Sequence, residues 1–396
     1  MFHLKSLQTT PSSLKSNMKI KASQPMIVNV LKSQTSSSST EMDPRIWSKL
    51  PQELLEHVLC FLPLKTFLNL RSTCKNFNSL VFSAPFVSKH SSASHLSSFL
   101  LLSHPQFYSH FPLYDITIGS WRNLAVPVSL FPSFASQFNL VSSSNGLLCF
   151  SLSNSCSFLV CNMLAKSARV IQHPFFPFSF ELLTLISTPK GYKIFMLCSK
   201  FPSNYAFVYD SKDHSWRKYH GFQPLLIDNF HQEGAFYKGS LCFSTPEPFS
   251  TVCFDLENGK WGNLNTEMPR ELTFVRLVSD TVKGKLYLVG GMGRNGISRT
   301  VRLWELGKGG NWEELARLPE LMCRKFVSVC YHKYEQVYCF WHEGMICVCC
   351  HTWPEILYYK VSRRSWHWLP KCPLMPDKWS CGFRWFSFAP HLYALP

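Results

Sequence analysis

The chain has 396 residues, of which 46% are hydrophobic, 16% charged and 15% aromatic. The charged fraction lies well below the ~25% of an average globular protein, which argues against long solvated helices or coiled coils as the main architecture. The formal net charge is +16, from 40 Lys and Arg against 24 Asp and Glu. Basic residues never form runs longer than two, so the sequence lacks the clustered basic pattern typical of nucleic-acid-binding proteins.

The sixteen cysteines are too few for the disulfide framework of a secreted protein of this length. The N-terminal residues contain no apolar segment of the secretory type, and no stretch reaches the ~18 apolar residues of a membrane-spanning helix. We therefore expect reduced thiols that pack as small apolar side chains, and no membrane partner.

Residues 1–43 form a Ser-rich leader, with ten Ser and no acidic residue among the first 40. Such a segment buries too little apolar surface to offset the entropy of ordering, which predicts disorder. A Ser-rich, acid-free leader also resembles an organelle transit peptide. The sequence thus favours a cytoplasmic and/or nuclear protein and leaves organelle targeting open.

Residues 44–90 are predicted to form a small bundle of three short helices. In LPQELLEHVLCFLP, apolar residues recur from Leu54 to Leu62 on one helical face, Pro51 and Glu53 suit the first turn, and Pro63 ends the run. LKTFLNLRS and TCKNFNSLVF supply the second and third helices. So small a bundle cannot hide all this apolar surface internally, so a partner is expected.

A repeat governs the remaining residues, 91–396. An apolar strand end, an acidic or polar residue, a turn and a Trp recur, with Asp115, Asp210 and Asp255 each six residues before a Trp. One copy has Ala168 in place of the Trp. The six anchor positions are 121, 168, 216, 261, 312 and 366, at intervals of 47, 48, 45, 51 and 54 residues.

A second marker, a turn Gly followed by an apolar strand, runs in phase with the first. It occurs at Gly146, Gly191, Gly239 and Gly284, and HKYEQVYCFW at 332–341 is interpreted as the same element without its Gly. A period of about 50 residues with two hairpins per unit predicts the four-stranded blades of a β-propeller. Six blades fit the anchors, and seven result if 372–396 and the segment near 100–120 complete another. The Trp is expected to pack between blades.

These residues resemble a plant F-box motif followed by kelch-type repeats, nearest the Hawaiian skirt and Unusual floral organs group. The fold expected is α+β and multidomain, with a small three-helix F-box at 44–90 and an all-β kelch-type propeller at 91–396. The F-box pattern includes Leu50-Pro51, Leu62-Pro63 and the run from Arg71 to Phe77. Phe77 stands where many members carry Trp, and the kelch Gly doublet is clear once, at Gly290-Gly291.

The resemblance implies a substrate-receptor subunit of an SCF-type (Skp1–cullin–F-box) E3 ubiquitin ligase, in the ubiquitin conjugation pathway that leads to protein degradation. Such a subunit does no chemistry and needs no cofactor; it places a substrate near the ubiquitin-loaded enzyme. The F-box would bind a Skp1-like adaptor, and through it cullin and RING subunits. The Skp1-binding residues implied are Leu50, Pro51, Leu54, Leu55, Val58, Leu59, Leu62 and Pro63.

Two alternatives keep the helical segment as a docking appendage: a propeller enzyme or a nucleic-acid-binding propeller. Gly291, Gly293 and Gly296 outline a dinucleotide loop, but a strand-like run follows where a helix is required, which favours a hairpin. Cys347, Cys349, Cys350 and His351, with His342 nearby, lack zinc-site spacing, and MICVCC is typical of a buried strand. We therefore predict no metal, no cofactor and no nucleic-acid partner.

The protein substrate is expected to bind to loops of the propeller, although the sequence does not identify it. Candidate contacts are the polar and aromatic residues of the Gly-rich loop and of the last predicted repeat, namely Arg294, Asn295, Arg299, Trp341, His342 and Trp353.

Overall fold

The computed structural model describes residues 45, 49–62, 66, 70, 73–80, 83, 85–86, 89, 98–107, 110–126, 138–152, 156–173, 180–198, 204–221, 231–375 and 378–396. The leader at 1–43, Pro63 and most of the second expected helix lie outside these residues. The chain divides into two compact units at residues 54 and 55, inside the first helix. Within the described part of the chain, no helix is long and apolar enough to cross a membrane.

Two helices of the F-box segment are described. Helix α2 (Gln52–Cys60) begins directly after Pro51 and carries Glu53 in its first turn, where an acidic side chain favours the positive helix end. Helix α4 (Lys75–Leu80) is shorter than the stretch expected from the sequence. Leu59 and Leu80 belong to one buried cluster. The predictions of the first and third helices are confirmed.

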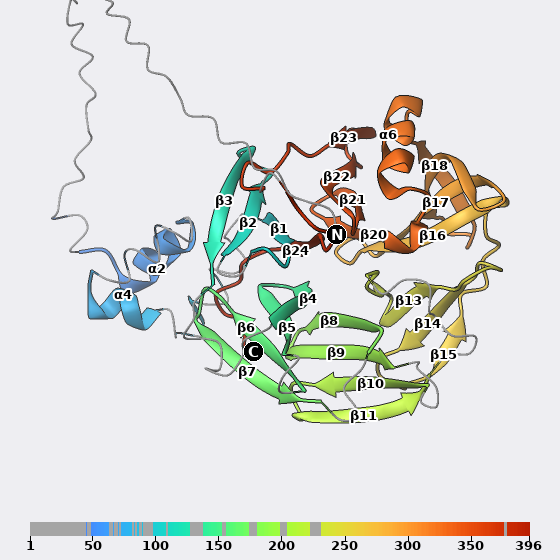
Figure 1. The fold of residues 1–396 in the computed structure, drawn as a ribbon. Coiled ribbons are helices and arrows are strands. Elements are labelled where there is room, and N and C mark those ends of the chain that lie inside the picture. The colour runs from blue at the N-terminus through green and yellow to red at the C-terminus, as the bar shows by residue number, and fades with distance from the viewer. Residues whose placement is uncertain are drawn as a thin grey trace, which may run out of the picture. The chain divides into compact units, whose positions relative to one another are not determined.

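The rest of the described chain forms six four-stranded antiparallel sheets, the blades of a propeller (Figure 1). In order within each sheet, the first three blades are β24 (Arg384–Phe388), β1 (Phe99–Ser103), β2 (His110–Asp115) and β3 (Ser120–Ala125); β4 (Phe138–Ser144), β5 (Leu147–Leu152), β6 (Ser157–Asn162) and β7 (Ser167–Gln172); and β8 (Leu182–Thr188), β9 (Gly191–Cys198), β10 (Tyr205–Asp210) and β11 (Ser215–His220). The next three are β12 (Ala235–Tyr237), β13 (Ser240–Ser244), β14 (Thr251–Asp255) and β15 (Trp261–Asn263); β16 (Leu272–Asp280), β17 (Lys285–Arg294), β18 (Ile297–Leu306) and β19 (Trp312–Arg317); and β20 (Val337–His342), β21 (Met345–Cys350), β22 (Trp353–Lys360) and β23 (Ser365–Trp368).

The ring closes through the C-terminal strand. The first strands of most neighbouring blades contact one another, and β24 contacts both β4 and β20. Strand β24 pairs with β1 from Phe99↔Phe388 to Ser103↔Arg384 and so supplies the first strand of the first blade. The C-terminal segment and the segment near 100–120 therefore complete the same blade that carries Trp121, and the propeller has six blades, not seven.

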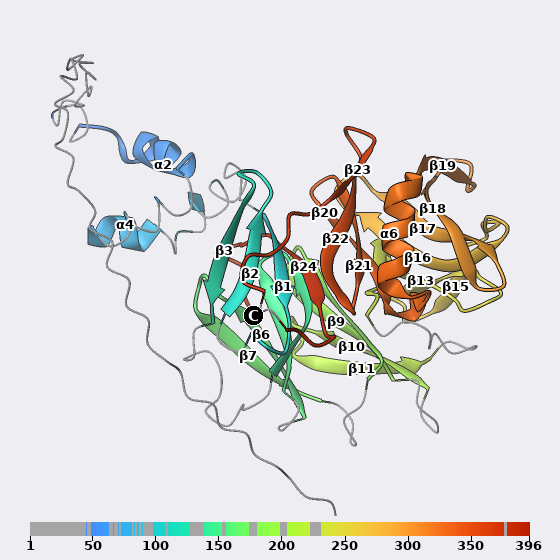
Figure 2. The ribbon, with the colours of Figure 1, turned by 45° about the horizontal axis from the view of Figure 1, so that its top comes forward.

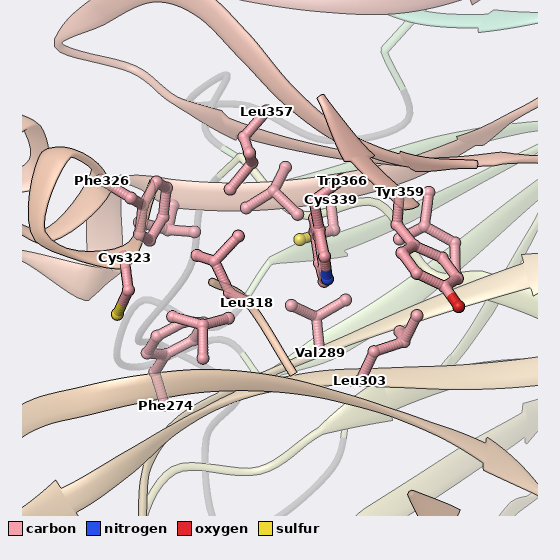
Figure 3. Packing of buried hydrophobic residues seen from close by; sticks show 14 of the residues in the cluster. Phe274, Val289, Leu303, Leu318, Cys323, Phe326, Cys339, Leu357, Tyr359 and Trp366 are labelled. Carbon is pink, nitrogen blue, oxygen red and sulfur yellow. The ribbon is translucent and has the colours of Figure 1, made fainter. Parts of the chain in front are cut away.

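Six buried apolar clusters lie between the blades, one for each neighbouring pair. Figure 3 shows the cluster between the fifth and sixth blades, where Val289 and Leu303 of one blade meet Leu357 and Tyr359 of the next. Burial of apolar surface at ~25 cal/mol per Å² is the dominant stabilising contribution in such an arrangement. All sixteen cysteines are described and unpaired, and twelve of them are buried.

The repeated Trp and Asp have distinct structural roles. The indole Nε1 of Trp216 donates to the carbonyl oxygen of Gln172 at 2.9 Å, and that of Trp261 to His220 at 2.9 Å. Both acceptors end the outer strand of the preceding blade, so these Trp side chains link blades, as expected. The repeated Asp caps its turn: Asp115 Oδ1 accepts from the two N–H groups at 117 and 118. Equivalent bonds occur at Asn162, Asp210 and Asp255.

The turn glycines precede or begin the second strand of a blade, and the prediction that 332–341 is the same element without its Gly was wrong. Asn145 and Gly146 have φ of 43° and 80°, which a two-residue hairpin turn of this type requires. The equivalent pair in the sixth blade is Glu343 and Gly344, at 42° and 78°. The segment at 332–341 instead forms the short helix η3 (Tyr334–Gln336) and the first strand, β20.

Helix α6 (Glu320–Cys330) was not predicted. It follows the fifth blade and lies beside β18, as Figures 1 and 2 show. Cys323, Phe326 and Cys330 recur at helical spacing and enter the cluster between the fifth and sixth blades. The helix accounts for the longest anchor interval, the 54 residues from Trp312 to Trp366.

Candidate functional site

Helix α2 exposes an apolar stripe. Leu54 and Val58 lie on α2 and Phe61 directly follows its last residue, at spacings of four and three residues that place the three side chains on the same side. Their side chains are 55%, 42% and 64% exposed, whereas the neighbouring Leu59 is 4% exposed. Three large apolar side chains in contact with water on one helix indicate a surface that a partner covers.

The other residues implied for Skp1 binding divide between this surface and the interior. Pro51 is exposed, and Leu50, Leu55 and Leu62 are half-buried. Leu59 is buried among the residues that pack the helices, so its side chain stabilises the F-box segment itself. Phe61 extends the exposed stripe and was missing from the sequence-based set, although its spacing from Leu54 and Val58 could have revealed it.

A second candidate site is a pocket of about 510 Å³ at one end of the propeller. In an up-and-down blade, the turn after the second strand and the connection after the fourth strand lie at the same end. The pocket is lined by such segments, including the β13–β14 turn and the connections that lead into β12 and β20, and by parts of strands β8, β13 and β16. The Asp-capped turns and the turn glycines that define the repeat lie at the opposite end.

The pocket walls combine aromatic rings with carboxylates. Phe243 and Phe274 are buried, and Phe249 is half-buried. Glu247 and Glu335 are exposed and also line the pocket, so they form its solvent-facing rim. Three of the 24 acidic residues of the chain, these two and Glu233, thus meet in one cavity of a strongly basic protein.

The third carboxylate, that of Glu233, is held deeper in the pocket by its neighbours in the chain. The Gln232 amide donates to the carbonyl oxygens of Leu277 at 3.1 Å and Cys339 at 3.0 Å, and accepts from Cys339 N at 2.8 Å. On the other side, Gly234 N donates to Thr184 Oγ1 at 2.9 Å. The segment that carries Glu233 is therefore tied to the first strands of three blades.

The electrostatics of Glu233 follow from its burial. Desolvation raises the pKa of the carboxyl to about 7, while the charge of Arg384 and a side-chain hydrogen bond with Ser142 lower that pKa. Its Oε1 atom is buried and has no hydrogen-bond partner among the described residues. A buried carboxylate oxygen without a donor costs free energy, which a donor from outside would recover.

The cation of the pocket, Arg276, is already engaged by the backbone. Its guanidinium donates to the carbonyl oxygens of Val337 at 2.5 Å, of Val275 at 2.6 Å and of Tyr334. The side chain is 6% exposed. Arg276 therefore fixes the wall between β16 and β20, and its donors are turned toward the backbone.

The loop that carries Glu247 and Phe249 is held by its own hydrogen bonds. Thr245 N donates to Ser250 O at 3.0 Å, Ser250 N donates to Thr245 Oγ1 at 2.8 Å, and the two hydroxyl oxygens are 2.9 Å apart. The closed loop presents Glu247 at the rim in a defined position, which lowers the entropic cost of binding.

Four of the predicted substrate-contact residues lie at the same end of the propeller as the pocket. Arg294 and Asn295 form the β17–β18 turn with Gly296, which lines the pocket, and Arg294 is paired with Glu271 at 3.0 Å. Arg299 is exposed on β18. Trp353 begins β22 after the β21–β22 turn and packs against the cluster between the fifth and sixth blades.

The remaining two predicted residues end β20, at the opposite end from the pocket. Trp341 stacks on Tyr287 of the fifth blade, with ring centroids 5.6 Å apart. His342 is fully buried; its Nδ1 lies 2.8 Å from Ser387 Oγ and its Nε2 3.3 Å from Ser98 Oγ. The assignment of His342 as a substrate contact was therefore wrong, because the imidazole bridges the strands that close the ring.

The motifs that suggested other chemistry are part of the blades. Gly293 and Gly296 lie in the hairpin between β17 and β18, as predicted, and a strand follows them. Every residue of MICVCC is buried in β21, and burial raises the pKa of Cys347 and Cys349, which keeps these thiols protonated. Among the described residues, no group of three or more His, Cys, Asp or Glu is arranged to hold a metal ion.

A helical segment with an exposed apolar stripe, joined in one chain to a six-bladed propeller, defines the class of F-box proteins with a propeller domain. The F-box domain model matches residues 47–89. The chain is 53% identical over 368 residues to an F-box/kelch-repeat protein of Arabidopsis thaliana, across 90% of both chains. It therefore belongs to the plant F-box/kelch-repeat family, whose members are typically non-catalytic ligase adaptors.

More distant relatives include two plant proteins. ABERRANT PANICLE ORGANIZATION 1 of Oryza sativa subsp. japonica is 27% identical over 91% of this chain and 93% of its own length. UNUSUAL FLORAL ORGANS of Arabidopsis thaliana is 26% identical over 85% of this chain and 82% of its own. The family as a whole implies a role as substrate adaptor, and the F-box domain implies Skp1 binding in general.

Proposed function

We propose that this protein is the substrate receptor of an SCF-type ubiquitin ligase, in which α2 binds a Skp1-like adaptor and the propeller binds the protein to be ubiquitinated. The observation that carries the proposal is the exposed stripe of Leu54, Val58 and Phe61 on the helix of the F-box. Burying such side chains gives about 1.5–3 kcal/mol each, enough for a stable helix-to-partner contact.

The propeller supports the second half of the proposal. Its repeated Asp and Trp residues maintain the blades, and at the other end the loops form a pocket with polar and aromatic walls. The receptor needs no catalytic group of its own, because holding a substrate lysine near the ubiquitin-loaded enzyme is catalysis by proximity. We also propose a cytoplasmic and/or nuclear location, where reducing conditions keep thiols unpaired.

The test is co-purification with a Skp1-like adaptor. The triple variant L54A/V58A/F61A should lose the complex on size-exclusion chromatography, because it removes the apolar stripe while leaving the buried Leu59 in place. The matched control V282A/L321A removes apolar side chains that are 91% and 79% exposed outside the F-box, and it should bind as the wild type does. Equal binding by the triple variant and the wild type would reject the interface.

Ubiquitination provides the second measurement. Affinity capture under proteasome inhibition would compare the wild type with the triple variant, which should accumulate bound substrates that are no longer ubiquitinated. If the same proteins are captured in the same ubiquitinated state by both, the receptor role is excluded.

A further inference from the structure

We infer that the pocket between the fourth and fifth blades binds a basic side chain, Arg or Lys, of a protein substrate. This inference rests on the proposed receptor function and adds the chemical class of the group that the propeller recognises. It is carried by the cavity itself, by the exposed carboxylates at its rim and by its aromatic walls.

The size of the cavity suits part of a peptide. A volume of about 510 Å³ lies within the ~300–1,000 Å³ range of ligand sites in proteins. It is larger than one side chain needs, so it can admit a long side chain together with the adjoining backbone. The hydrogen-bonded loop at Thr245 and Ser250 and the tied segment at Gln232 mean that its walls are already in place.

The charges select a cation. Glu247 and Glu335 stand at the rim, and Glu233 lies further in. The guanidinium of Arg276, the buried cation of the pocket wall, donates to three backbone carbonyl oxygens. A phosphate or carboxylate at the rim would therefore meet Glu247 and Glu335 and no donor of Arg276, whereas a guanidinium or ammonium would meet acceptors. Glu233, further in, already faces the charge of Arg384.

The aromatic walls suit the stem and the face of the same side chain. Phe243, Phe249 and Phe274 line the pocket together with Leu182 and Leu277. Long basic side chains bury their methylene stems against apolar surface, and their cationic ends are attracted to aromatic faces and to carboxylates. Because the carboxyl of Glu233 already faces the charge of Arg384, the rim carboxylates of Glu247 and Glu335 are the main acceptors for the cation. This arrangement contrasts with the net charge of +16, which by itself would favour an acidic partner.

The experiment uses the full chain in complex with its Skp1-like adaptor and a fluorescein-labelled peptide, Gly-Gly-Arg-Gly-Gly amide. The comparison peptide carries citrulline, which keeps the shape of arginine and lacks its charge, and a third carries Glu. By fluorescence anisotropy the Arg peptide should bind about tenfold more tightly than the citrulline peptide, equivalent to about 1.4 kcal/mol. The Glu peptide should bind more weakly than both.

The variants locate the interaction. E247Q/E335Q should weaken binding of the Arg peptide about fivefold to tenfold and leave the citrulline peptide unchanged. The control E257Q/E313Q removes two exposed carboxylates away from the pocket and should bind as the wild type does. Equal affinity for the Arg and citrulline peptides, tighter binding of the Glu peptide, equal losses in both double variants, or no binding at millimolar concentration would each overturn the inference.

The outcomes separate this inference from the proposed function. Complex formation with the Skp1-like adaptor is measured first and depends on α2, not on Glu247 or Glu335. If the adaptor complex forms and the Arg peptide shows no preference, the receptor role stands and the pocket assignment fails. If the L54A/V58A/F61A variant still binds the adaptor while the Arg peptide binds selectively, the F-box interface fails and the pocket assignment stands.

Discussion

His342 gives the sharpest quantitative prediction. Its imidazole is fully buried between Ser387 of β24 and Ser98, at the point where the two ends of the propeller meet. Burial lowers the pKa of His342 from the ordinary 6.5 to about 4, because the charged form is desolvated. Since the unfolded chain binds the proton more readily, the free energy of unfolding falls as the pH drops from 6.5 toward 4.

The size of the effect follows from the two pKa values. Linkage gives a loss of about 2 kcal/mol at pH 5 relative to pH 7 from this residue alone. The variant H342Q keeps a donor and an acceptor for the two serines but cannot titrate. Desolvation also lowers the pKa of His231, to about 3, and the same loss from that residue is present in both proteins and cancels in the difference.

The assay is urea unfolding followed by Trp fluorescence at pH 5, 7 and 8. Between pH 7 and 8 the two proteins should differ by a constant amount, which is the cost of the Gln itself. Between pH 7 and 5 the wild type should lose about 2 kcal/mol more than H342Q. Parallel curves over the whole range would show that the imidazole is hydrated or charged in the native state, and would refute the reasoning.

Three further substitutions test other parts of the structure. G146A should lower the free energy of unfolding by about 1 kcal/mol because of the φ of 80°, and by more because the new Cβ would lie 2.5 Å from the His391 nitrogen. G239A has a φ of 85° and open space around it, so it should show the backbone strain alone. Equal thermal unfolding of the two variants would contradict the close packing of Gly146 against His391. D255A should lower the free energy of urea unfolding by about 1 kcal/mol, because two backbone N–H groups lose their acceptor; an unchanged midpoint would argue against the capping role. E233Q removes a carboxyl group whose pKa is raised by burial from 4.5 to about 7. The free energy of unfolding of the wild type should therefore fall by about 3 kcal/mol relative to that of E233Q as the pH rises from 4.5 to above 7. Urea unfolding profiles that stay parallel over this range would refute the sign.

The propeller could be predicted because its markers are local. The Asp or Asn that caps the turn occurs in four of the six blades, and the Trp that follows it occurs in five, since each blade packs against its neighbours in the same way. The anchor spacing therefore gave six blades. Strand β24 was harder to place, because the pairing of Phe99 with Phe388 joins residues from opposite ends of the chain, and no local pattern reports such a pairing.

The pocket could not be predicted for a related reason. Glu233, Glu247 and Glu335 belong to three separate connections, and only the ring brings them together. The Gly-rich loop was a partial guide, because Asn295 adjoins Gly296 at the pocket wall. His342 was misleading, because it was expected on a propeller loop, whereas it ends strand β20 and its side chain contacts two serines of the closing blade.

The two ends of the propeller divide its structural and recognition roles. At one end, Asp-capped turns and turn glycines fix the hairpins, so changes there should act on stability. At the other, Glu247 and Glu335 are exposed at the rim of the pocket, so replacing them should alter recognition without unfolding the blades. The basic net charge reflects a small number of acidic residues, and three of them line the pocket where a cationic side chain would bind.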